Sequence, residues 1–163
     1  MKNVKAIVIA AVLAALATPA FAQSGADPRV KEALEAAGLK YSVNSSDNFK
    51  VVYQMDSDPD RSHLVFIVSR TSTYRDLEIR EIWSVAAILD AFPDDEVVHR
   101  LLAMNSTAKL GAWAIEESEG EVWVMYTVKV PFDLSPEELN DAIYFVAEVC
   151  DELESELTGS DEY

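Results

Sequence analysis

The chain has 163 residues, with 29 aspartate and glutamate residues against 13 lysine and arginine residues, and its formal net charge is −16 at pH 7. A surface this acidic repels phosphate groups, so we expect neither a nucleic-acid partner nor docking on anionic lipid. The charge favours basic proteins, cationic peptides or divalent cations as partners, although it also serves simply to keep a protein soluble. Cys150 is the single cysteine, which excludes an intramolecular disulfide, so stability must come from a hydrophobic core.

The start of the chain, residues 1–22, has the layout of a secretory signal peptide. Lys2 and Lys5 precede an apolar run, and Ala20-Phe21-Ala22 supplies small residues at a cleavage site. The apolar run is shorter than the roughly 20 residues that a spanning helix needs, although an uncleaved membrane anchor is the alternative. We therefore expect cleavage after Ala22, a periplasmic or secreted location without stable membrane insertion, and a single domain over residues 23–163.

Local signals in the first half of the chain predict one helix followed by four strands. Asp27-Pro28 combines an N-cap with proline at the first helical position, and Gly38 is placed to end this helix. The strand that begins at Leu77 alternates apolar and charged residues, but its second half, to about Ala86, also fits one face of a helix. The strands are predicted at residues 39–43, 49–55, 64–69 and 77–86.

The second half of the chain predicts a helix, a hairpin and a long final helix. Residues 93–105 read as a helix, and strands at 110–115 and 122–130 are joined by an acidic turn in which Gly120 supplies a positive φ. The stretch 135–138 (Ser-Pro-Glu-Glu) forms a capping box that opens a helix to Leu157. The order α-β-β-β-β-α-β-β-α predicts an α+β domain with a mostly antiparallel sheet and packed helices.

Several segments of the second half resemble the YbjN-like proteins, which are bacterial proteins described as sensory transduction regulators. The resemblance is clearest over residues 97–157 and rests on the segments 101–105, 109–113 and 134–139, the acidic hairpin, and a closing helix that contains Asp151. It implies a fold similar to that of type III secretion chaperones, an α+β unit that often dimerises and holds peptide segments. It brings no catalytic residues, and the export signal distinguishes this chain from cytoplasmic members.

The sequence contains no motif that points to catalysis or to a cofactor. G-x-S-x-G, the P-loop and G-x-G-x-x-G are all absent, so we expect no enzyme, no catalytic residue and no cofactor. The loop at residues 56–60 opens like an EF-hand, but Arg61 and Ile67 replace the glycine and the glutamate that such a loop requires. His63 and His99 have no ligand spacing around them, so we expect no metal site. Weak cation binding by the acidic loops is the alternative.

Cys150 falls on an apolar line of the final helix. Its members recur at helical spacing, which predicts that Cys150 is buried rather than engaged in redox chemistry or an intermolecular disulfide. The line consists of Leu139, Ile143, Val146, Cys150, Leu153 and Leu157.

The three tryptophans, Trp83, Trp113 and Trp123, are the candidate partner-binding residues. Trp113 and Trp123 lie on the two arms of the hairpin, and both hairpin faces carry apolar side chains. Either helices cover both faces of the sheet, or one face is an apolar patch used for dimerisation or peptide capture. We predict a non-enzymatic exported protein that acts by contact with a protein or peptide partner, which includes a homodimer. The alternative is an envelope protein that binds a cation or small ligand.

Overall fold

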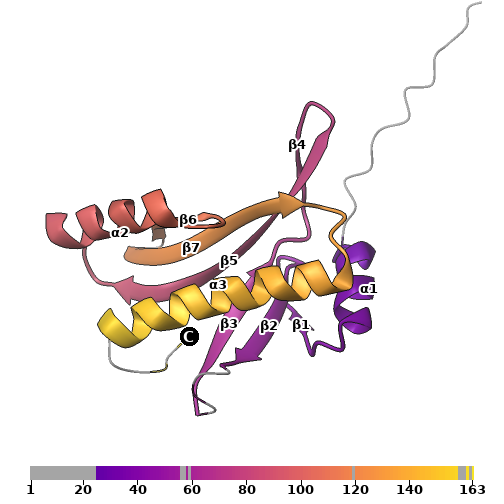
Figure 1. The fold of residues 1–163 in the computed structure, drawn as a ribbon, viewed down its shortest axis with the longest axis horizontal. Helices are drawn as coiled ribbons and strands as arrows, with labels where there is room; N and C mark the ends of the chain where they lie inside the picture. Colours follow the sequence, from indigo (N-terminus) through magenta and orange to yellow (C-terminus); the bar gives the residue numbers. More distant parts are fainter. Residues whose placement is uncertain (1–24, 56–57, 59, 119, 158–160, 162) are drawn as a thin grey trace, which may run out of the picture.

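The computed structural model describes residues 25–163 except 56–57, 59, 119, 158–160 and 162. The predicted signal peptide and most of the 56–60 loop therefore lie outside the described residues. The predicted α+β class and the order α-β-β-β-β-α-β-β-α are confirmed, and one further three-residue strand, β4, precedes β5 (Figure 1). The elements are α1 (Pro28–Ala36), β1 (Ser42–Val43), β2 (Phe49–Gln54), β3 (Ser62–Ile67), β4 (Ser72–Tyr74), β5 (Leu77–Leu89), α2 (Asp95–Thr107), β6 (Ala112–Ser118), β7 (Glu121–Pro131) and α3 (Pro136–Leu157).

The strands form one sheet in the order β1-β2-β3-β5-β7-β6, with β4 paired to β5, and each of these pairings is antiparallel. The central strand β5 pairs with β7 along most of its length and contains a bulge between Val85 and Ala87. It continues to Leu89, so the alternative of a helix over its second half is wrong. Residues on both sides of the bulge are buried, which explains why this segment is apolar on both faces instead of alternating.

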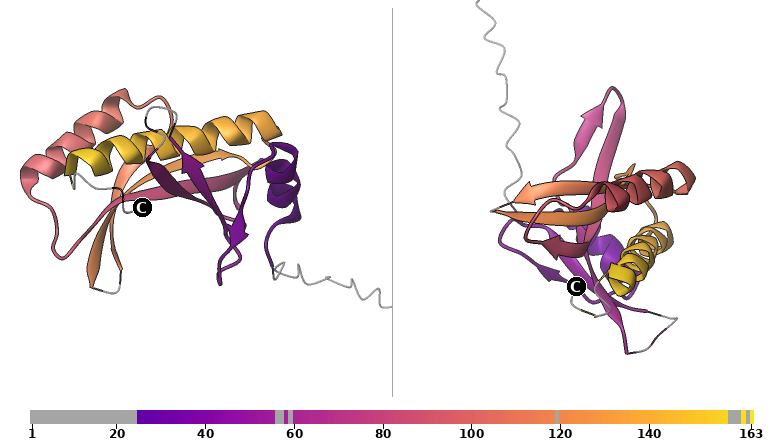
Figure 2. Two further views of the ribbon diagram at one scale, coloured as in Figure 1. Left: turned by 90° about the horizontal axis from the view of Figure 1, so that it is seen from below. Right: turned by 90° about the vertical axis from the view of Figure 1, so that its left-hand side faces the viewer.

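All three helices in the described part of the chain lie on one side of the sheet (Figure 2). An ion pair between Arg100 and Glu156 joins α2 to α3, and α1 contributes Val30 and Leu34 to the same core. Cys150 is fully buried on the inner side of α3, as predicted. Each large aliphatic side chain buried here contributes about 1.5–3 kcal/mol, so the core stabilises the fold without a disulfide. No helix in the described ranges has the length and apolar character needed to cross a membrane.

Side-chain caps fix the starts of the helices, as the sequence predicts. In the capping box of α3, the Glu138 amide donates to Ser135 Oγ at 3.2 Å, and the Ser135 amide donates to Glu138 Oε2 at 2.8 Å. At α1, Asp27 Oδ1 accepts a hydrogen bond from the Arg29 amide at 2.9 Å. These local bonds set where α1 and α3 begin.

The turn from α2 into β6 depends on Gly111. Its φ is +80°, and a Cβ at this position would collide with the Thr127 carbonyl oxygen and the Val128 side chain. The Asn105 side chain then bridges the end of α2 to the edge of β6, because its Oδ1 accepts from the Trp113 amide at 2.6 Å and its Nδ2 donates to the Trp113 carbonyl at 3.2 Å. The hairpin that carries two of the three tryptophans is thereby fixed against the helical layer.

Candidate functional site

The structure separates the three candidate tryptophans between the two faces of the sheet. Trp113 pairs with Tyr126, packs edge-to-face on its ring at 5.0 Å between centroids, and is only 6% exposed in the core. Trp123 pairs with Ile88 on the opposite face, and Trp83 lies on that same face. Side chains alternate along a strand, so Trp113 and Trp123 point to opposite sides although they belong to one hairpin.

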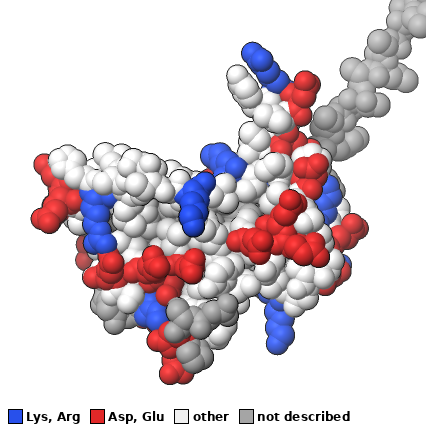
Figure 3. Space-filling view, viewed as in Figure 1, with Lys and Arg blue, Asp and Glu red and all other residues white. Residues whose placement is uncertain are grey.

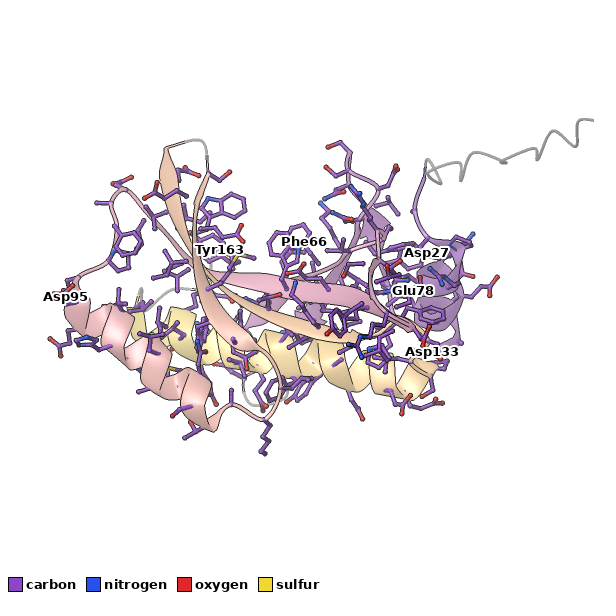
Figure 4. All side chains as sticks on the ribbon, turned by 90° about the horizontal axis from the view of Figure 1, so that it is seen from above. Asp27, Phe66, Glu78, Asp95, Asp133 and Tyr163 are labelled. Atoms are coloured by element: carbon purple, nitrogen blue, oxygen red, sulfur yellow. The ribbon has the colours of Figure 1, made fainter. Side chains whose placement is uncertain are left out.

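Three aromatic rings meet on the face away from the helices. Phe66 of β3 stacks on its cross-strand neighbour Trp83 of β5, with ring centroids 4.2 Å apart and planes 11° apart. The ring centroids of Trp83 and Trp123 of β7 are 6.5 Å apart, and their planes are inclined at 40°. Figure 4 shows Phe66 on the side of the sheet away from α3. We call Phe66, Trp83 and Trp123 the aromatic patch.

Aliphatic side chains lie beside the aromatic patch on the same face of the sheet. Val85 and Met125 are a cross-strand pair on this face, but they are only 7% and 6% exposed and add little accessible surface. Val52, on β2, pairs with Leu64 and is 66% exposed. No helix of the described residues lies over this face of the sheet (Figure 2). Contiguous apolar surface on a soluble domain typically marks an interaction site. Of the two arrangements that the sequence left open, the structure has the uncovered face.

Charged groups border the aromatic patch. Glu81 forms an ion pair with Lys129 Nζ at 3.1 Å and accepts a hydrogen bond from Thr127 Oγ1 at 2.7 Å, and these residues share the face with Trp83. Near the hairpin tip, the Trp123 indole Nε1 donates to Glu121 Oε2 at 3.3 Å. An apolar centre with a charged border is the usual anatomy of a protein interface.

A buried ion pair anchors α1 at the far end of the sheet. Arg80 on β5 is 2% exposed and donates to Asp27 Oδ2 at 2.7 Å and to the Val68 and Ser69 carbonyl oxygens. Arg29 also contacts Asp27 and reaches Glu78 at 2.8 Å (Figure 4). Burial opposes ionisation of Asp27, but the hydrogen bonds from Arg29 and Arg80 outweigh it and hold the pKa of this carboxyl well below its usual range. Both arginines are held by acidic partners, which indicates a structural role.

A second buried charged cluster lies between β3 and the C-terminal half of α3. His63 and Glu154 are both fully buried, with His63 Nδ1 and Glu154 Oε2 3.5 Å apart. Arg61 binds Asp151 at 2.8 Å and Glu154 at 3.4 Å from the more exposed side. The sequence does not predict this cluster, because its acidic members lie about 90 residues from His63 along the chain. The only available signal was the i, i+3 pair of acids on an otherwise apolar helix face.

Comparisons with known proteins add no family to this description. No family model matches the chain, and no curated protein matches it. The resemblance to the YbjN-like proteins therefore stays a prediction from the sequence, and the aromatic patch carries the functional proposal by its own chemistry.

Proposed function

We propose that this is an exported, non-enzymatic protein that binds a basic polypeptide segment on the aromatic patch. The observation that carries the proposal is the cluster of Phe66, Trp83 and Trp123 on one face of a sheet, while the helices of the described residues lie on the other face. Aromatic rings held rigidly by cross-strand pairs can desolvate a partner with little loss of side-chain entropy.

The charge of the chain favours a basic partner over a second copy of this protein. With a net charge of −16, two copies repel each other, whereas a segment rich in lysine or arginine is attracted. Acidic side chains also form several groups on the surface drawn in Figure 3. On the aromatic patch itself, a lysine or arginine placed over an indole face gains about 0.5–2 kcal/mol from the cation–π interaction. Apolar side chains of the same segment would cover the accessible parts of the aromatic patch and the exposed Val52 beside it.

The proposed role agrees with what the resemblance implies. Type III secretion chaperone-like proteins hold peptide segments, and a YbjN-like protein carrying a signal peptide would meet its partner in the periplasm or outside the cell. The fold alone does not establish a function, so the proposal rests on the uncovered patch.

A short peptide of alternating leucine and lysine is a direct probe of this function. We expect it to bind the purified chain and to change tryptophan fluorescence, and we expect Trp83→Ser or Phe66→Ser to weaken binding by at least tenfold. Leu102→Ser is the matched control, because Leu102 is 61% exposed on α2 and outside the aromatic patch. A peptide of alternating leucine and glutamate should bind more weakly, because it is repelled by the acidic surface.

Two outcomes would overturn the proposal. Equal binding by the wild type, Trp83→Ser and Leu102→Ser would remove the aromatic patch as the site. Sedimentation of the wild type as a stable dimer, together with a monomeric Trp83→Ser variant, would show that a second copy occupies the patch instead.

A further inference from the structure

The buried cluster between β3 and α3 brings together three side chains of the kinds that bind transition metals. One ligand atom from each of His63, Asp151 and Glu154 lies within 4.8 Å of the others, and all three residues are buried. Asp151 and Glu154 are three residues apart on α3, which places both carboxylates on one helix face. Acidic residues alone would not indicate a metal site, but the buried imidazole of His63 is an independent observation that does.

The hydrogen bonding of His63 fixes the direction of its free lone pair. Its Nε2 lies 3.0 Å from the Val85 carbonyl oxygen, and a carbonyl only accepts hydrogen bonds, so Nε2 carries the proton. In the neutral ring, Nδ1 is then an unprotonated acceptor, and it is buried without a hydrogen-bond partner. It points toward Glu154 Oε2, which is also an acceptor when ionised. Arg61 reaches Glu154 Oε2 at 3.4 Å from the surface side, but His63 Nδ1 stays without a hydrogen-bond partner, and a cation bound between Nδ1 and the carboxylate would supply one.

The spacing fits a metal ion better than a shared proton. A hydrogen bond from nitrogen to a carboxylate spans about 2.7–2.9 Å, well short of the 3.5 Å between His63 Nδ1 and Glu154 Oε2. Zinc binds nitrogen and oxygen at about 2.0–2.2 Å, and tetrahedral geometry then places the two ligand atoms about 3.4 Å apart. Metal-binding histidines also typically donate their second ring N–H to a carbonyl, as His63 does to Val85.

We propose that His63, Asp151 and Glu154 bind a divalent transition-metal ion, best matched by zinc, between β3 and α3. The mixed nitrogen and oxygen ligands suit zinc, whereas calcium and magnesium prefer oxygen ligands alone. The site is structural in kind, since it ties the end of α3 to the sheet on the face opposite the aromatic patch.

Arg61 is the counter-ion that the metal would displace. Its side chain is 17% exposed and reaches Asp151 and Glu154 from the surface side, while Glu154 and His63 are fully buried. Without a metal, the guanidinium offsets the charge of the two carboxylates. A bound divalent ion takes over this role, and Arg61 can turn toward solvent. Removing Arg61 should therefore strengthen metal binding, whereas removing a ligand should abolish it.

The test is a zinc titration of the purified full chain after treatment with a chelator. We expect one equivalent to bind by calorimetry and to raise the melting temperature, and we expect His63→Ala to lower the affinity by more than about 100-fold, because even changes behind the ligands cost 10–100-fold. His99→Ala is the matched control, because His99 is exposed on α2 and is the only other histidine. Cobalt in place of zinc should give the visible absorption of a tetrahedral site.

The Arg61→Gln variant separates a metal site from a merely structural cluster. In chelator, we expect the melting temperature of this variant to fall, because two buried carboxylates lose their counter-ion. Zinc should restore the melting temperature, and the variant should bind zinc more tightly than the wild type does. If His63→Ala does not fold, Glu154→Gln replaces it in the comparison. Absence of zinc binding, or equal binding by the wild type and the ligand variants, would overturn the proposal. Neither result would affect peptide binding at the aromatic patch.

Discussion

Cys150 lies on the face of α3 that packs against β5, where its Sγ is 3.6 Å from the Ser84 carbonyl oxygen. Burial raises the pKa of this thiol to about 12, so almost none of it is the reactive thiolate near neutral pH. We expect Cys150 of the native protein to resist a disulfide reagent at about pH 8, where an exposed cysteine thiol reacts readily. In urea, where the chain is unfolded, Cys150 should react at once. Following reagent absorbance with time checks this.

The rate of Cys150 labelling at urea concentrations below the unfolding transition gives a control for this prediction. If labelling requires unfolding, mild destabilisation should accelerate it in proportion to the unfolded fraction. Stoichiometric labelling of the folded chain within seconds would instead mean that Cys150 is accessible, and would restore a redox or intermolecular role for it.

At the scale of the element, the Asp27 carboxylate holds the start of α1 against the buried Arg80 of β5. Asp27 caps α1 and also neutralises the buried Arg80, so we expect Asp27→Asn to lower the free energy of unfolding by about 3–5 kcal/mol, the cost of leaving a buried charge without its partner. Asp94→Asn is the matched control. Asp94 caps α2 by accepting from the Val97 amide at 3.0 Å in an exposed position, where asparagine caps equally well. Urea unfolding at neutral pH measures both variants.

The pH dependence of the same variants gives an independent check. The pKa of Asp27 is lower in the folded than in the unfolded chain, so its stabilising effect is complete above the unfolded value of about 4 and is lost as the pH falls below it. The difference between the wild type and Asp27→Asn should therefore narrow on acidification below about pH 4. A difference that stays constant down to pH values well below 4 would contradict the ionic role of Asp27.

The elements that the sequence predicts well are those with local chemistry. The Ser135 capping box, the Asp27 N-cap and Gly120 at the hairpin tip, whose φ is +91°, each act within a few residues, and the structure has each of them. The strand β4 was missed because its three residues are exposed and carry no periodic pattern. Alternation along β7 correctly groups Trp123 with Met125, but only the docking of α3 decides which face stays uncovered. The pairing of His63 with Glu154 depends on tertiary packing that no local spacing encodes.

At the scale of the whole molecule, the two faces of the sheet differ. Helices and a fully packed core occupy one side of the sheet, while the other side presents the aromatic patch (Figure 2). The net acidic charge of the chain, in contrast, sets the long-range field. The aromatic patch would therefore decide how tightly a partner binds, and the overall charge would decide which partners approach.

The overall charge also acts on the stability of the chain itself. Twenty-nine acidic against 13 basic side chains repel one another in the compact state, and salt screens that repulsion over distances of about 10 Å at 0.1 M. We expect the melting temperature at neutral pH to rise as sodium chloride is added from low concentration. The same titration close to the sequence pI of about 4.3 is the control, because the net charge there is near zero and the rise should largely disappear. A melting temperature that falls with salt at neutral pH would mean that specific ion pairs such as Arg80–Asp27 outweigh the general repulsion.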